Sequence, residues 1–181
     1  KSGSYLGLDY IYRTLSDSDG EDPLDCPRML AYDGKVFIAA TQAKTGQPYY
    51  FTKADMREND YAPLCASCSI PGVCRPYFIN GTAYFDGGVS DPIPVKKALE
   101  LGCDSLTVIL TRPINRLPDG RSEKISAALI KKEYPYTAQA LLNRREKYIE
   151  ALSLAEELEK QKKYDYFTSS STCKRNYSRS R

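Results

Sequence analysis

The sequence contains no histidine among its 181 residues. This absence excludes, within this chain, a Ser-His-Asp triad, a Cys-His dyad and every histidine-ligated metal site. Any acid–base chemistry must therefore be carried out by carboxylate, lysine, tyrosine or cysteine side chains.

Excess charge of one sign and long hydrophobic runs are also missing. The 26 Lys and Arg residues against 23 Asp and Glu residues give a formal net charge of +3, which is too small to indicate nucleic-acid binding. The longest apolar runs, at 36–40 and 106–110, fall far below the roughly 18 residues of a membrane span, and residues 1–12 lack the apolar core of a signal peptide. With 41% apolar and 27% charged residues, the composition predicts one soluble globular domain.

Six cysteines are present, and three of them form the one cluster that could suggest zinc, Cys65-x-x-Cys68 followed by Cys74. A structural zinc site takes four ligands, usually as two close pairs, whereas Cys26 and Cys103 are isolated in the sequence. We therefore expect the cysteines to be small buried hydrophobes in a reducing cytoplasm, with no bound metal.

The first half of the chain is predicted to form short strands. Residues 35–41 and 49–52 are rich in β-branched and aromatic side chains and could pair with each other. Asn80-Gly81 lies between two aromatic-rich runs, 77–79 and 82–85, and this pair is the strongest local signal for a β-hairpin.

The second half alternates between helix and strand. Residues 95–101 predict a helix ended by Gly102, and residues 105–111 predict a strand buried on both faces of a parallel sheet. A helix followed by a buried strand is half of an α/β unit, so we expect an α/β fold with helices packed on a largely parallel sheet. A polar tail, 164–181, is expected to be disordered.

Residues 137–163 carry apolar side chains at spacings of three and four, which predicts one long amphipathic helix. Its charged side chains are interpreted as a solvated face that needs no ligand: Arg144, Arg145, Glu146, Lys147, Glu156, Glu157, Glu159 and Lys160.

Asp86-Gly87-Gly88 is the segment most able to support chemistry. Asp86 closes a predicted strand, and the two glycines allow a sharp turn and close approach to the carboxylate. Carboxylates at the carboxyl ends of strands are where α/β enzymes place working residues. An Asp-Gly-Gly sequence is equally compatible with a purely structural turn.

Several short motifs occur along the chain, namely Thr45–Phe51, Ala66-Ser67, Pro71-Gly72, Asp86-Gly87-Gly88 continuing to Val95, Val108–Pro113 and Asn143–Tyr148. Taken together, they resemble the second half of a bacterial patatin-like phospholipase. The resemblance covers roughly residues 1–163, which we interpret as the C-terminal portion of a patatin domain.

The resemblance implies a serine acyl hydrolase that uses a Ser-Asp dyad without histidine, with Asp86 as the base and Gly87 and Gly88 forming the motif turn. It implies a patatin-like three-layer α/β/α fold, of which this chain holds an incomplete C-terminal portion. The substrate would be a lipid or other ester, with no cofactor and with transient contact to a membrane surface. A free aspartate, with a pKa near about 3.9, is a poor base, and partial burial beside a hydroxyl would raise that pKa.

The nucleophile motif Gly-x-Ser-x-Gly occurs nowhere in the chain, and its nearest counterpart, Gly3–Gly7, has Tyr5 at the nucleophile position. We therefore expect the nucleophilic serine and the glycine-rich oxyanion loop to lie upstream of Lys1, and this chain alone to be inactive. The alternative is a non-catalytic binding or regulatory module with the same fold.

Overall fold

The structure is a computed structural model that describes residues 7–111, 113, 117, 120–160 and, for the backbone alone, 165–168. It divides into two compact units. The first comprises Lys1–Ile93 and Asp119–Tyr148, and the second comprises Pro94–Pro118 and Ile149–Arg181.

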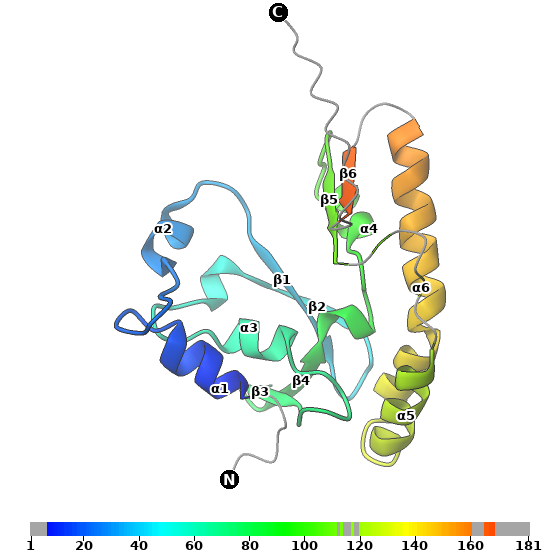
Figure 1. The fold of residues 1–181 in the computed structure, drawn as a ribbon, viewed down its shortest axis with the longest axis horizontal. Helices are drawn as coiled ribbons and strands as arrows, with labels where there is room; N and C mark the ends of the chain where they lie inside the picture. Colours follow the sequence, from blue (N-terminus) through cyan, green and yellow to red (C-terminus); the bar gives the residue numbers. More distant parts are fainter. Residues whose placement is uncertain (1–6, 112, 114–116, 118–119, 161–164, 169–181) are drawn as a thin grey trace, which may run out of the picture. The chain divides into compact units, whose positions relative to one another are not determined.

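The first unit is built on a four-stranded antiparallel sheet with strand order β2-β1-β4-β3 (Figure 1). The strands are β1 (Phe37–Gln42), β2 (Pro48–Thr52), β3 (Tyr77–Ile79) and β4 (Thr82–Asp86). The predicted pairing of the first two strands is confirmed. The sequence predicts a largely parallel sheet, but the short connections from β1 to β2 and from β3 to β4 can join only antiparallel neighbours, since a parallel pair needs a long crossover.

The predicted hairpin at Asn80-Gly81 is confirmed. Asn80 has φ 49° and Gly81 has φ 75°, so both central residues take the left-handed conformation that a tight two-residue hairpin turn requires. Tyr77 on β3 consequently faces Tyr84 on β4 in the antiparallel register.

The helices of this unit precede, interrupt and follow the strands. Residues 9–15, which the sequence leaves open between helix and strand, are helical. The helices are α1 (Leu8–Tyr10), extended by a π-helical turn (Ile11–Leu15), α2 (Cys26–Ala31), α3 (Ala62–Ser67), α5 (Arg121–Ile130) and the first half of α6 (Pro135–Lys160).

Strand β4 is buried on both faces, because its successive side chains point to opposite sides of the sheet. Tyr84 packs in one core cluster with Phe51 of β2 and Ala66 of α3. Phe85 packs in another with Tyr134, whose ring lies edge-on at 5.3 Å between centroids. The last residue of the strand, Asp86, therefore lies in a well-packed part of the unit.

The second unit contains α4 (Val95–Glu100), β5 (Thr107–Leu110), β6 (Asp165–Thr168) and the second half of α6. The predicted helix at 95–101 is confirmed, and Gly102 follows it with φ 79°. Strand β5 pairs in parallel with β6, a strand formed within the expected tail; the rest of residues 164–181 lies outside the described residues. The predicted helix over 137–163 is confirmed as far as Lys160, and 161–163 lie outside the described residues as well.

The prediction that β5 is buried on both faces is wrong. Burial alternates along it, and Ile109 is 77% exposed. In the described part of the chain one row of β5 side chains is covered and the other row, which includes Ile109, is not. Among the helices of that same part, none has both the length and the apolar character to cross a bilayer.

Replacing Gly87 by alanine should strongly destabilise the first unit. A Cβ atom at residue 87 would lie 2.3 Å from the backbone oxygen of Ala39 on β1, so the backbone itself must move. We expect Gly87→Ala to lower the free energy of unfolding by about 2–3 kcal/mol, measured by urea denaturation at neutral pH.

Gly7→Ala is the matched control. A Cβ atom there would meet only the Tyr10 Cβ, at 3.6 Å, which is an ordinary contact distance. Equal urea midpoints for the two variants would contradict the close approach of β1 to the turn.

Candidate active site

Asp86 is held at the carboxyl end of β4 by its own backbone. Its N–H donates to the carbonyl oxygen of Ser69 at 2.9 Å, and its carbonyl accepts from the Thr41 hydroxyl at 2.8 Å. Thr41 is fully buried and also shares a 2.8 Å hydrogen bond with the hydroxyl of Ser90. The main chain therefore has little freedom at the position from which the carboxylate projects.

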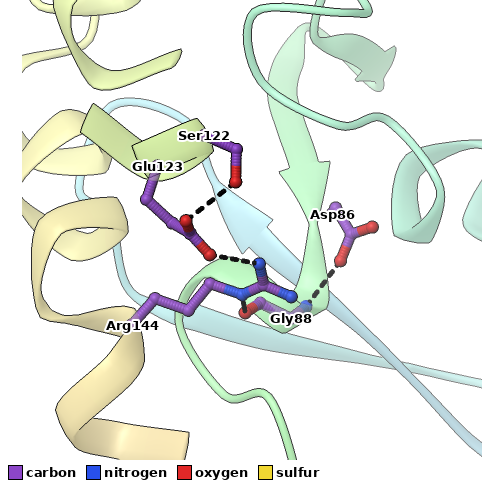
Figure 2. Close-up of polar contacts among 5 residues, drawn as sticks. All are labelled: Asp86, Gly88, Ser122, Glu123 and Arg144. Atoms are coloured by element: carbon purple, nitrogen blue, oxygen red, sulfur yellow. Dashed lines mark hydrogen bonds and ion pairs between the residues drawn. The ribbon is translucent and has the colours of Figure 1, made fainter. Parts of the chain in front are cut away.

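The Asp86 carboxylate has one bonded oxygen and one open oxygen. Its Oδ1 accepts from the N–H of Gly88 at 2.7 Å, two residues along the 3-10 turn Gly87–Val89 (Figure 2). Within the described residues, Oδ2 accepts no hydrogen bond and no hydroxyl donates to either oxygen. The second oxygen is therefore available to a group that this part of the chain does not supply.

Asp86 lines a pocket of about 170 Å³ in the first unit. One part of the wall is apolar and includes Ile70, Val73, Val89 and Leu141. The polar part consists of Asp86, Ser122, Glu123, Ser126 and Arg144. A pocket with an apolar wall and a few converging polar groups is the usual form of a small-molecule site.

Burial raises the pKa of the Asp86 carboxyl above its ordinary value. The hydrogen bond from the Gly88 N–H and the positive charge of Arg144 both act in the opposite direction, and they do not cancel the effect of burial. Buried acids with raised pKa values are better proton acceptors than free ones and concentrate at functional sites.

Arg144 of α6 connects this turn to α5, as Figure 2 shows. Its Nε donates to the carbonyl of Gly88 at 2.7 Å, and its Nη1 pairs with Glu123 Oε1 at 3.0 Å. The Glu123 side chain is only 7% exposed, and its other oxygen accepts from the Ser122 hydroxyl at 2.9 Å. Gly88 is thus bonded to Asp86 through its N–H and to Arg144 through its carbonyl.

The two glycines of the motif turn have different steric roles. Gly87 has no room for a Cβ atom because of the backbone of Ala39. At Gly88 a Cβ atom would lie 3.0 Å from Asp86 Oδ1, so a side chain there would crowd the carboxylate rather than the strand.

The structure places Arg144 and Lys147 differently from the sequence interpretation. Instead of belonging only to a solvated face, Arg144 is 31% exposed and lines the pocket, and Lys147 Nζ donates to the Ser90 carbonyl at 3.0 Å. The pocket residues of α5 were also missed. The sequence carries no signal for them, because a glutamate in the first turn of a helix is an ordinary surface feature.

The cysteine cluster does not form a metal site in the described part of the chain, where no three Cys, Asp or Glu side chains gather as ligands. The five described cysteines are free thiols. Burial raises the pKa of Cys65 to about 11, and Cys68 Sγ lies 3.3 Å from the Tyr12 hydroxyl. A thiol with so high a pKa is a structural residue rather than a reactive one.

The sheet, its helices and the carboxylate pocket define an α/β protein with a candidate active site. Residues 11–99 match the model of the family described as patatin-like phospholipase, and this match contains the whole Asp86-Gly87-Gly88 turn. Residues 11–99 are therefore similar to the patatin-like phospholipase family, in agreement with the resemblance of the sequence motifs.

One relative is the "Uncharacterized protein YjjU" of Escherichia coli (strain K12), which is 33% identical over 115 residues. The aligned region covers 62% of this chain but 31% of the relative. The chain therefore spans about a third of the length of the curated protein that it matches.

Removing the charge of Arg144 should destabilise the first unit, because Glu123 would be left buried without its cation. We expect Arg144→Met to lower the free energy of unfolding by about 2–3 kcal/mol, measured by urea denaturation. The double variant Glu123→Gln/Arg144→Met should recover part of this loss.

Arg145→Met, one residue along on the exposed side of α6, is the control and should leave the free energy of unfolding almost unchanged. A loss similar to that of Arg144→Met would contradict the pairing of Arg144 with Glu123.

The raised pKa of Asp86 predicts a pH-dependent stability difference. Because the folded-state pKa lies above the unfolded value, the native state binds more protons between the two values, and stability falls as pH rises through this window. Asp86→Asn keeps an acceptor for the Gly88 N–H and removes the buried charge. It should be more stable than the wild type at pH 7, with the difference shrinking as the pH falls towards the ordinary aspartate value.

Thermal unfolding across this pH range measures the effect. Asp91→Asn, which disturbs a carboxylate bonded by the Tyr50 hydroxyl, is the control and should not gain stability at neutral pH. A wild type that becomes more stable relative to Asp86→Asn with rising pH would contradict the assignment.

Proposed function

We propose that this chain is part of a patatin-like serine acyl hydrolase that cleaves carboxylic esters of lipids, with Asp86 as the general base. The observation that carries the proposal is the geometry of the Asp86 carboxylate. It lies at the end of a buried strand, lines a pocket with an apolar wall, is oriented through Oδ1 and has an open Oδ2. The family match supports lipid hydrolysis as the class of reaction.

In this proposal the nucleophilic serine comes from a segment upstream of Lys1. Asp86 would accept the serine proton while the serine oxygen attacks the ester carbonyl, and the protonated carboxyl would then return the proton to the leaving alcohol. Water, deprotonated by the same carboxylate, would release the acid from the acyl-enzyme. The raised pKa supports this role, since a carboxylate with a higher pKa is a stronger base toward the serine proton.

The apolar wall of the pocket supports an acyl chain as the bound group. Ile70 and Val73 follow α3, and Leu141 comes from α6, so the wall is assembled from segments far apart in the sequence. Contact with hydrocarbon would remove their exposed surface from water. We infer no cofactor and no nucleic-acid partner for this reaction.

We also propose that residues 1–163 form the C-terminal portion of a patatin domain whose complete fold is a three-layer α/β/α arrangement on a largely parallel sheet, with residues 164–181 as a polar tail. The partial coverage of the relative supports a longer protein, and the β5–β6 pair supports a parallel component. The free thiols support a reducing cytoplasmic location.

A second candidate function is a non-catalytic binding or regulatory module. It is favoured by one observation: among the described residues no hydroxyl donates to Asp86, and no Gly-x-Ser-x-Gly occurs in the sequence. The pocket and the oriented carboxylate would then bind a partner group without turning it over.

The decisive experiment starts from the coding sequence upstream of Lys1. We expect it to encode Gly-x-Ser-x-Gly within about 100 residues, and the longer product to hydrolyse a short-chain nitrophenyl ester, whereas the 181-residue chain alone does not. Asp86→Asn in the longer product should lower kcat by about a thousandfold, because the base is lost while the fold is kept.

Asp91→Asn is the matched control in this assay. It removes a carboxylate only five residues further along, which does not line the pocket, and should leave kcat close to that of the wild type. An active Asp86→Asn enzyme would reject the base, and a longer product without the serine motif would favour the binding module.

A further inference from the structure

Helix α5 (Arg121–Ile130) presents two faces with different surroundings. On the inner face Glu123 and Ala127 are buried, and Ser122, Glu123 and Ser126 line the pocket that contains Asp86. On the outer face Ile125 is 65% exposed and Leu129 is 67% exposed. The same ten-residue helix thus borders the candidate site and carries uncovered hydrocarbon.

Ile125 and Leu129 are four residues apart and therefore lie next to each other on the helix surface. Ala128, also exposed, continues the apolar surface between them. Single apolar residues scattered on a surface are ordinary, whereas Ile125 and Leu129 form one continuous exposed patch on this face of the helix.

Basic side chains surround this apolar pair. Lys124 lies beside Ile125, and Lys131 and Lys132 directly follow the helix. All three are exposed, and within the described part of the chain none of them forms an ion pair. Of the two acidic residues in this segment, Glu123 pairs with Arg144 on the inner face, whereas Glu133 is exposed and accepts from the uncharged Tyr134 hydroxyl. The three lysines therefore outnumber one exposed carboxylate. The outer face is therefore both apolar and cationic.

We propose that the outer face of α5, defined by Lys124, Ile125, Leu129 and Lys132, docks on an anionic phospholipid surface. An interfacial helix inserts apolar side chains at the boundary between headgroups and acyl chains while its lysines contact the phosphates. Each basic residue near such a surface adds to the attraction and loses it as salt is added.

The charge pattern favours a lipid surface over a second copy of this chain. Two copies joined through the same outer face would bring their lysines together, and like charges in contact oppose association. Two inserted aliphatic side chains and a few lysines give weak, reversible binding rather than permanent anchoring. A role for this docking in ester hydrolysis rests on the proposed function, because α5 also lines the pocket and would hold the pocket against the lipid.

Vesicle binding of the 181-residue chain tests the proposal without any hydrolysis. Co-sedimentation at about 0.1 M salt would compare vesicles of phosphatidylcholine and phosphatidylglycerol in equal parts with vesicles of phosphatidylcholine alone. We expect binding to the anionic vesicles that is at least about tenfold stronger than to the neutral ones.

Two variants separate the apolar from the electrostatic contribution. Ile125→Ser/Leu129→Ser should weaken binding to anionic vesicles about tenfold or more, and Lys124→Glu/Lys132→Glu should abolish the preference for anionic lipid.

The matched control for the apolar variant is Phe78→Ser, which removes a side chain 62% exposed on β3. The matched control for the charge variant is Lys35→Glu at an exposed loop position. Both controls should bind like the wild type. Circular dichroism checks that each variant is folded.

The proposal is overturned if the folded chain binds neither vesicle, or if the control variants lose as much binding as those in α5. It is also overturned if Ile125→Ser/Leu129→Ser converts a dimer into a monomer in sedimentation velocity while vesicle binding persists. Asp86→Asn should bind vesicles like the wild type, so a failure of the hydrolase proposal is distinguishable from a failure of this one.

Discussion

The backbone of Gly88 links the parts of the candidate site. Its N–H donates to Asp86 Oδ1 and its carbonyl accepts from Arg144 Nε, both at 2.7 Å. The first bond orients the carboxylate, and the second ties the turn after β4 to α6. Because Arg144 also pairs with Glu123, the same guanidinium positions α5, so a strand end and two helices are fixed around one residue.

This arrangement buries a carboxylate at a cost in stability. Burial raises the pKa of Asp86, which means that folding is less favourable with this carboxyl ionised than with it protonated. The Gly88 N–H and the charge of Arg144 offset part of that penalty. Proteins retain such unfavourable groups where an activity needs them, and residues that only hold a fold together rarely need one.

Local sequence patterns predicted much of the fold, but the sequence did not predict how distant strands pair or which of their faces are covered. Asn80-Gly81 predicted the hairpin because both residues accept the left-handed conformation that the turn demands, and the long helical periodicity predicted α6 up to Lys160. The four-stranded sheet of the first unit is antiparallel where the sequence predicts a largely parallel sheet, because strand composition does not reveal pairing direction. The exposure of Ile109 was missed because a run of apolar residues in a strand does not show whether one or both faces of the strand are covered.

The sequence by itself determined the turn after β4. Asp86 at the end of a predicted strand and the two glycines after it predict a sharp turn. The backbone oxygen of Ala39 on β1, which lies 2.3 Å from where a Cβ atom of residue 87 would be, is known only from the tertiary structure. Only the tertiary structure decided that Arg144, 56 residues away, reaches this turn and that α5 keeps an apolar face uncovered. The physical reason is that a helix pattern fixes which side chains share a face, whereas packing against the sheet decides which face is buried.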